Sequence, residues 1–403
     1  MTKTHSNRTL HYYMTVLPVI LMFFLVFHNP DLSAKENISE FTFNPQSEYW
    51  PTKGWKTSTP EKQGMSSKIL VEIFEEIENR NVDITSLLVV RNGYIVVEAN
   101  RYYAETIHPI YSSTKSVVSA VFGIALSKGH IKNIDQTLPN YFPELSHKNG
   151  EEKKASITLK NLLTMSCGFE WPEVQMGYSN PENPAIQMLK SSNTIQYILN
   201  KPVKQQPGQN FNYNSGCSHL LLAVLKRTGL NVADFAQENL FTPLGIPKSQ
   251  YIWSQDPNGI PNGGYGLNMR SRDMAKFGYL YLKGGNWEGK QIIPKTWIEE
   301  STKKQIIMTW GGFVADHYGY KWYIHSFGFH SLGARGQYIF VIPKQELVVV
   351  FTSNLPRFQI VIPIDLVKSY VIPAVIASRP LLENEEAIAT LKSKSKKFKD
   401  NQF

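Results

Sequence analysis

The sequence predicts a mixed α/β fold of the α+β type, with one antiparallel sheet built from both ends of the chain and flanked by helices. Three observations favour it. Strand-like apolar runs occur near residues 87–98 and again at 320–352, and the segment from about 130 to 270 is rich in Pro, Gly, Asn and Ser between short helices. The economical arrangement is a sheet with a mostly helical insertion packed on it. With 403 residues, 42% of them hydrophobic, the chain can bury a large core.

The first part of the sheet is the clearest local signal. Residues 87–91 and 94–98 are apolar runs separated by Asn92-Gly93, the pair that favours a two-residue hairpin turn. Before them, residues 66–80 repeat apolar side chains at helical spacing after a serine that can cap the helix. We therefore expect a helix followed by a β-hairpin.

The remaining elements follow from the same periodicities. Further strands are expected at 320–325, 336–342 and 347–352, and helices at 157–165, 217–228 and 271–282. Residues 360–376 are apolar but interrupted by Pro363 and Pro373, which is typical of a kinked packing helix. The main folded body is thus expected over 61–385, with the sheet from about 61–105 and 315–385.

The two ends differ from this body. Residues 12–27 are almost wholly apolar after Lys3 and Arg8, which indicates a signal peptide or uncleaved signal anchor over 1–34 and a location outside the cytoplasm. A polar leader is expected over 35–60. Residues 386–403 hold much of the basic excess behind the net charge of +9, and we expect a disordered tail that could contact a cell wall or membrane surface. No nucleic-acid motif accompanies this charge.

The chain has two cysteines, Cys167 and Cys217. In an oxidising compartment they could pair, and two buried free thiols are about equally expected. Their spacing does not match a structural zinc site, and no metal or organic cofactor is indicated.

The candidate nucleophile is Ser112, which precedes an apolar helix together with Lys115. Three residues apart on a helix, the two side chains share one face. A serine needs a base within hydrogen-bond reach, and a lysine can be that base if burial lowers its pKa. A helix N-terminus also favours an oxyanion.

The bare Ser-x-x-Lys pattern is weak evidence, because it also occurs at Ser301/Lys304 and Ser393/Lys396. A serine-rich cap on a core helix explains the stretch around Ser112 as well. A second acid/base group is therefore needed, and Tyr213 lies in a polar loop before a helix. A tyrosine near a lysine ammonium loses its proton more easily. A structural hydrogen bond is the ordinary alternative for any tyrosine.

The order Ser-x-x-Lys, loop tyrosine and Gly-rich strand resembles the penicillin-recognising serine hydrolases, above all the class C β-lactamase-like branch with its D-alanyl-D-alanine peptidases, family VIII-type esterases and 6-aminohexanoate-dimer hydrolases. The resemblance covers roughly residues 60–378. It is carried by residues 110–117, 128–131 with Asp135, 162–168, 207–213, 271–278 and 336–339.

This resemblance implies a β-lactamase/transpeptidase-like fold and assigns roles. Ser112 would be the nucleophile, Lys115 its base and Tyr213 a proton-transfer group. The backbone N–H groups of Ser112 and Gln337 would form the oxyanion hole, with Gly336 beside them.

Two departures from the family pattern bear on the substrate. Ser215 stands at a position where the branch often has Asn. Ala334 stands at a position where β-lactamases have Lys and many relatives have His, so the cation there is missing unless Arg335 replaces it. We therefore place Ser215 and Arg335 among the substrate-binding residues and expect an acyl-enzyme hydrolase of small esters, amides or peptides. The alternatives are a D-alanyl-D-alanine peptidase or weak class C-type β-lactamase, and a catalytically inactive cell-wall-binding module.

Overall fold

The computed structural model describes residues 49–145, 152–308 and 314–398. Its centre is an eight-stranded sheet in the order β2-β1-β13-β12-β11-β10-β9-β8. The strands are β1 Ile84–Arg91, β2 Tyr94–Asn100, β8 Ile306–Ile307, β9 His317–Tyr318, β10 Tyr323–Ile324, β11 Phe329–Gly333, β12 Gln337–Ile342 and β13 Leu347–Ser353. Every pairing in it is antiparallel. The expected sheet from both chain ends is therefore confirmed.

The pairing of β1 with β13 joins the two ends of the chain at the centre of the sheet. Val89 faces Val349 and Leu88 faces Val350 in that register. Every residue of β1 and of β13 is buried, as expected of strands covered on both faces. The hairpin turn at Asn92-Gly93 has φ values of 52° and 84°, the left-handed pair that a type I′ turn requires.

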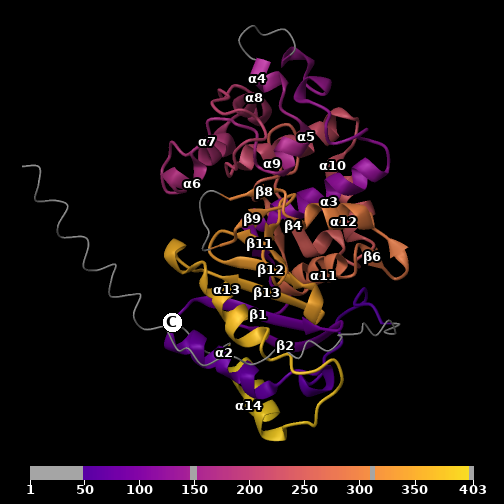
Figure 1. Cartoon of the computed structure of the whole chain (residues 1–403), viewed down its shortest axis with the longest axis vertical. Helices are drawn as coiled ribbons and strands as arrows, with labels where there is room; N and C mark the ends of the chain where they lie inside the picture. Colours follow the sequence, from indigo (N-terminus) through magenta and orange to yellow (C-terminus); the bar gives the residue numbers. More distant parts are fainter. Residues whose placement is uncertain (1–48, 146–151, 309–313, 399–403) are drawn as a thin grey trace, which may run out of the picture. The chain divides into compact units, whose positions relative to one another are not determined.

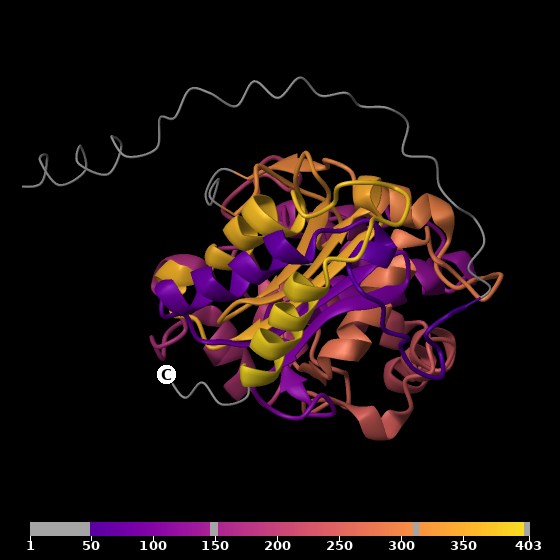
Figure 2. The same cartoon turned by 90° about the horizontal axis from the view of Figure 1, so that it is seen from below.

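Helices cover both faces of this sheet. On one face lie α2 Ser67–Asn79, α13 Ile362–Leu366 and α14 Glu385–Lys397, and on the other α3 Thr114–Ser127 and α11 Ser271–Leu282. Figure 2 shows α2 and α14 lying side by side across the sheet. The Ser66 hydroxyl caps α2 by accepting from the Ile69 N–H at 3.4 Å. A π-helical turn continues α13 through Val371, so a packing helix is present inside the expected range 360–376. Pro363 lies in its first turn and Pro373 beyond its end, so the prolines bound the helix.

The insertion gathers at one end of the described part, above the sheet in Figure 1. Its helices are α4 Glu152–Ala155, α5 Leu159–Leu163, α6 Glu173–Met176, α7 Pro184–Lys190, α8 Thr194–Leu199, α9 Ser215–Arg227 and α10 Val232–Ala236. A small sheet joins β3 His108–Pro109, which precedes the insertion, to β5 Leu267–Met269 and β4 Tyr251–Trp253, which follow it. The hairpin of β6 Asn286–Trp287 and β7 Lys290–Gln291 and the helix α12 Lys295–Ser301 come later in the chain. Helix α5 is shorter than expected, and the small sheet has no counterpart in the sequence prediction.

The expected disordered tail is wrong for most of its length, because its residues up to Lys397 form the amphipathic helix α14. Ile388 and Leu391 are buried against the body, and Asn384 caps the helix by accepting from the Ala387 N–H at 3.0 Å. Acidic residues in the first turn and lysines in the last also complement the helix dipole.

The polar leader also packs where it is described. Trp50 contacts the rings of Tyr279 and Trp287, with centroids 5.7 and 5.2 Å apart. The expected signal segment lies outside the described residues. Within the described ranges, none of the helices combines the length and the apolar character that crossing a membrane would need.

Candidate active site

Ser112 lies in a single 3₁₀ turn, Tyr111–Ser113, that leads directly into α3. Tyr111 has φ 45°, a left-handed conformation that costs a residue with a side chain on the order of 1–3 kcal/mol and that tends to occur at functional sites. Ser112 is half-buried, whereas every residue of α3 up to Ala125 is buried. The turn thus presents one hydroxyl at the accessible end of a core helix.

Lys115 is only 1% exposed, yet its ammonium-bearing end is surrounded by oxygen atoms. Nζ lies 3.0 Å from Ser112 Oγ, 3.1 Å from Ser215 Oγ and 2.6 Å from the Gly264 carbonyl oxygen. Burial lowers the pKa of Lys115 from 10.5 to about 8, while the nearby Glu173 carboxylate opposes that change. A lysine with such a pKa is neutral often enough near pH 8 to accept a proton from Ser112.

Tyr213 lies against the same lysine, with Nζ 4.7 Å from its ring centroid. It is 5% exposed, and burial, reinforced by Tyr323 and Tyr178, raises its pKa well above 10. The expectation that the lysine makes this tyrosine easier to deprotonate is therefore wrong. Desolvation disfavours the phenolate, so Tyr213 stays a neutral phenol at neutral pH.

Ser215 begins α9 and is buried behind Lys115, with its hydroxyl already engaged. Besides the contact with Lys115, Ser215 Oγ donates to Glu173 Oε1 at 2.7 Å, and its backbone N–H donates to Oε2 at 2.8 Å. The side chain thus contacts Lys115, and its predicted role in substrate binding stays a prediction.

Glu173 is the main site residue that sequence reasoning missed. It opens α6, is fully buried, and also accepts from Trp171 Nε1 at 2.7 Å and from the Tyr178 hydroxyl at 2.9 Å. A buried carboxylate with this many donors is well compensated for its desolvation. No spacing rule links it to Ser112. The only hint in the sequence is that this acidic residue lies between two aromatic residues, Trp171 and Tyr178.

The Gly264 loop is held by a second buried pair. His219 Nε2 lies 3.1 Å from Asp256 Oδ2, and His219 Nδ1 accepts from the Gly263 N–H at 3.4 Å. Asn262 Oδ1 also accepts from the Gly264 N–H at 3.0 Å. These contacts fix the Gly264 carbonyl, which binds Lys115. In the sequence, the run Asn262-Gly263-Gly264 was the signal that could have indicated this loop.

The β11–β12 hairpin brings β12, which begins at the predicted oxyanion residue Gln337, against the Tyr111–Ser113 turn. Ser113 Oγ donates to the Gln337 carbonyl at 3.1 Å, and Ser331 Oγ lies 3.0 Å from Ser113 Oγ. A Cβ on Gly333 would stand 2.1 Å from the Ile110 carbonyl oxygen, so only glycine permits this approach. The Gln337 carbonyl is therefore held against Ser113, next to Ser112, and the predicted role of the Gln337 N–H in an oxyanion hole stays a prediction.

The other predicted residues of this hairpin form its turn. Arg335 and Gly336 have φ values of 62° and 85°, and the Gly336 N–H donates to the Gly333 carbonyl at 3.1 Å. The Arg335 side chain is exposed, and the Gln337 side chain folds back to the Ser353 carbonyl at 2.7 Å. A backbone role suits Gln337, and the substrate role of Arg335 stays a prediction.

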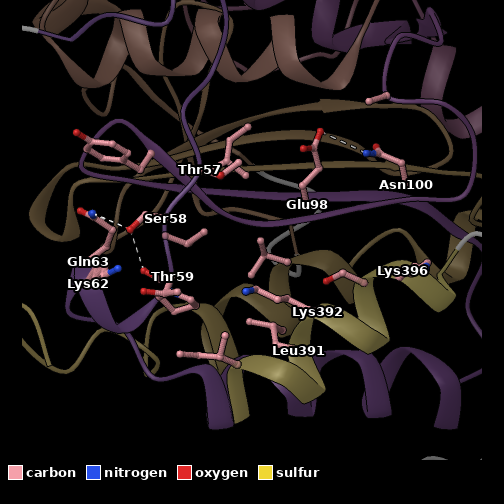
Figure 3. Close-up of a pocket in the computed structure, with 18 of the residues that line it drawn as sticks. Thr57, Ser58, Thr59, Lys62, Gln63, Glu98, Asn100, Leu391, Lys392 and Lys396 are labelled. Atoms are coloured by element: carbon pink, nitrogen blue, oxygen red, sulfur yellow. Dashed lines mark hydrogen bonds between the residues drawn. The ribbon is translucent and has the colours of Figure 1, made fainter. Parts of the chain in front are cut away.

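Two further findings lie away from Ser112. The structure joins Cys167 to Cys217, so of the two alternatives left open by the sequence it shows the disulfide. A groove of about 980 Å³ runs between β2 and α14, lined among others by Glu98, Lys392 and Lys396 (Figure 3). It contains none of the predicted catalytic residues.

Known proteins share this arrangement. A family model described as Beta-lactamase matches residues 73–359. The 6-aminohexanoate-dimer hydrolase of Paenarthrobacter ureafaciens is 23% identical over 71% of this chain and 76% of its own length. The lovastatin esterase of Penicillium rubens is 25% identical over 43% of this chain, and the match spans about half, 51%, of that relative.

Solved structures agree on the fold. A Bacillus anthracis protein, provisionally assigned as a 6-aminohexanoate-dimer hydrolase, superposes with a TM-score of 0.62 at 23% identity, covering 79% of this chain and 87% of that one. A D-amino acid amidase from Ochrobactrum anthropi reaches 0.58 at 16% identity, covering 76% and 97%. Because the family model spans well over half of the sequence, the chain belongs to the beta-lactamase family of serine hydrolases.

Proposed function

We propose that this protein hydrolyses a small ester or amide through an acyl-enzyme on Ser112. The observation that carries the proposal is the 3.0 Å contact between Ser112 Oγ and a buried Lys115 whose pKa is lowered to about 8. A positioned base of matched pKa contributes typically ~10²–10⁴-fold to the rate. The esterase and amide hydrolase among the relatives support this substrate class.

The first half of the reaction forms the acyl-enzyme. Ser112 Oγ attacks the carbonyl carbon while its proton passes to Lys115 Nζ. The oxyanion is bound by the backbone N–H groups of Ser112 and Gln337, each worth about 3 kcal/mol in comparable sites. Tyr213, a neutral phenol, donates a proton to the leaving oxygen or nitrogen and regains one from the Lys115 ammonium.

The second half releases the acid by the same steps in reverse. Water attacks the acyl carbonyl carbon as its proton passes through Tyr213 to Lys115. When the tetrahedral intermediate collapses, the bond to Ser112 Oγ breaks and Lys115 returns a proton to that oxygen. Ser112, Lys115 and Tyr213 are thereby restored, and one water is consumed for each ester or amide cleaved.

A fluorophosphonate probe with an intact-mass readout tests this reaction directly. We expect one adduct on Ser112, turnover of short-chain p-nitrophenyl esters, and loss of both in Ser112→Ala. An adduct on Ser113 would contradict the residue assignment but keep the class. A protein that is neither labelled nor active on any ester or amide would be the non-catalytic binding module.

The substrate preference rests on the hairpin. Ala334 offers no cation at the position where β-lactamases of the class C branch hold one, which favours esters and amides over β-lactams. Strong turnover of nitrocefin or of a D-Ala-D-Ala peptide, measured beside the esters, would reverse this preference in favour of the alternative weak β-lactamase or D-alanyl-D-alanine peptidase.

We also propose that the protein works outside the cytoplasm, secreted or anchored. The apolar run at 12–27 and the Cys167–Cys217 disulfide support this, because disulfides persist in oxidising compartments. Lysines of α14, in place of a disordered tail, are then the candidates for contact with a cell wall or membrane surface. Fractionation of the producing cell tests the location.

A further inference from the structure

The three partners of Lys115 constrain where its lone pair points. A neutral lysine amine has two hydrogens and one lone pair. The Gly264 carbonyl, 2.6 Å away, can only accept, so it takes one hydrogen. The second hydrogen and the lone pair must be divided between Ser215 Oγ and Ser112 Oγ, at 3.1 and 3.0 Å. Lys115 can act on Ser112 as a base only if Ser215 accepts.

Ser215 has one hydroxyl hydrogen, and Glu173 decides where it goes. Glu173 Oε2 is bound by the Ser215 backbone N–H and by Trp171 Nε1, and both of these groups can only donate. Oε1 lies 2.7 Å from Ser215 Oγ and 2.9 Å from the Tyr178 hydroxyl. A carboxylate oxygen in that position is an acceptor. The Ser215 hydroxyl therefore donates to Glu173 and leaves its lone pairs for Lys115.

We propose that Glu173 is a positioning residue that, through the Ser215 hydroxyl, sets the hydrogen-bond direction that aims the lone pair of Lys115 at Ser112. The inference rests on the proposed function and names the residue that keeps its base in the active orientation. The same arrangement also stabilises the lysine ammonium that forms when Lys115 accepts the proton of Ser112. All three hydrogens of the Lys115 ammonium then have an oxygen acceptor, and the negative charge of Glu173 lies one hydroxyl away.

Glu173→Gln reverses this direction without changing the shape of the side chain. The two donors at Oε2 require the amide oxygen there, so the NH₂ group must face Ser215 and donate to its oxygen. The Ser215 hydrogen then turns toward Lys115 and occupies the lone pair. We expect roughly a 100-fold fall in kcat and in the rate of Ser112 labelling, the scale of general-base catalysis, with KM unchanged. Glu170→Gln, an exposed neighbour, is the matched control and should behave as wild type.

The double variant separates direction from packing. Ser215→Ala removes the hydroxyl that could turn, so we expect only a modest loss, about tenfold or less. Glu173→Gln added to Ser215→Ala should then cost little more, which makes the double variant more active than Glu173→Gln alone. Losses that multiply, or a Glu173→Gln enzyme as active as wild type, would overturn the proposal. A thermal melt of each variant confirms that it is folded at the assay temperature.

Neutron diffraction on the wild-type protein at pH 9 gives a readout that needs neither a variant nor turnover. We expect the Ser215 deuterium to point to Glu173 and two deuterium atoms on Lys115, directed at Gly264 and Ser215. A Ser215 deuterium directed at Lys115 would overturn the inference even in an active enzyme. If instead the wild type neither labels nor hydrolyses esters, the proposed function fails while the deuterium position still decides the role of Glu173.

Discussion

The ionisation of Lys115 gives a quantitative prediction for the pH dependence of kcat/KM. Burial lowers the pKa of this lysine from 10.5 to about 8, a difference worth about 3 kcal/mol at ~1.36 kcal/mol per pKa unit. The base is the neutral form, so activity should rise with pH and level off above the lowered pKa. At pH 7 roughly a tenth of the molecules would hold a neutral lysine, against about 0.03% for an unperturbed one.

The assay is hydrolysis of a p-nitrophenyl ester between pH 6 and 10, with the Ser112→Ala variant as the blank for spontaneous hydrolysis. We expect kcat/KM to rise about tenfold per pH unit up to pH 7 and to bend near pH 8. Tyr213 should add no falling limb below pH 10, because burial raises its pKa well above that value. The plateau should therefore hold to the end of the range.

Two results would refute this reasoning. A rise that continues tenfold per unit through pH 9.5 would mean that Lys115 keeps an ordinary pKa despite its burial. A fall in kcat/KM beginning near pH 8 would mean that a neutral Tyr213 is needed but ionises easily, the opposite of what its surroundings dictate. Because kcat/KM reports the free enzyme, a slow product-release step does not disturb either test.

Three further changes probe the frame around the site. Gly333→Ala should lower kcat/KM about 100-fold, because the added Cβ would push against the Ile110 carbonyl and a misplacement near 1 Å typically costs that much. A variant with wild-type activity would contradict the close approach of Gly333 to Ile110. Replacing Cys167 and Cys217 by serine should lower the free energy of unfolding by up to about 4 kcal/mol, because the disulfide closes a separation of 50 residues. An unchanged midpoint in a denaturant titration would argue against the disulfide. Leu391→Ala in α14 should cost about 2–5 kcal/mol in the same titration, whereas a disordered tail would lose nothing.

Much of the fold could be predicted because its central strands carry strong local signals. The Asn92-Gly93 turn between two apolar runs specifies a hairpin, and the apolar run 347–351 of β13 specifies a strand, without help from the rest of the chain. The two-residue strands β8 and β9 carry no periodicity, so they could not be found, whereas β10 lies inside the strand expected at 320–325. Helix α14 was misjudged because its lysines dominate its composition, while only a few apolar side chains anchor it.

The residues of the candidate site also differ in whether a local sequence signal could reveal them. Ser112 and Lys115 are three residues apart, so their spacing, together with the apolar run that follows them, could pair them. Gly264 contacts Lys115 directly, Glu173 acts on it through Ser215, and the His219–Asp256 pair holds the Gly264 loop. All of them lie far from Lys115 in the sequence, and no spacing rule links them to it. Sequence reasoning therefore found the groups to which the proposed mechanism assigns the chemistry, but not Glu173, Gly264 or the His219–Asp256 pair around them.

The acid/base assignment shows why burial had to be known before roles could be given. The sequence suggested that a lysine ammonium would help Tyr213 to ionise, which treats the pair as charges in water. In the folded chain both groups lose solvent together, and desolvation penalises whichever form is charged. For lysine the charged form is the protonated one, so its pKa falls to about 8, and for tyrosine it is the deprotonated one, so its pKa rises. In the proposed mechanism, the same buried environment thus suits Lys115 to the role of the base and Tyr213 to that of the acid. The carboxylate of Glu173 keeps the lysine pKa from falling further, which suits the proposed base to the ester hydrolysis proposed for this site.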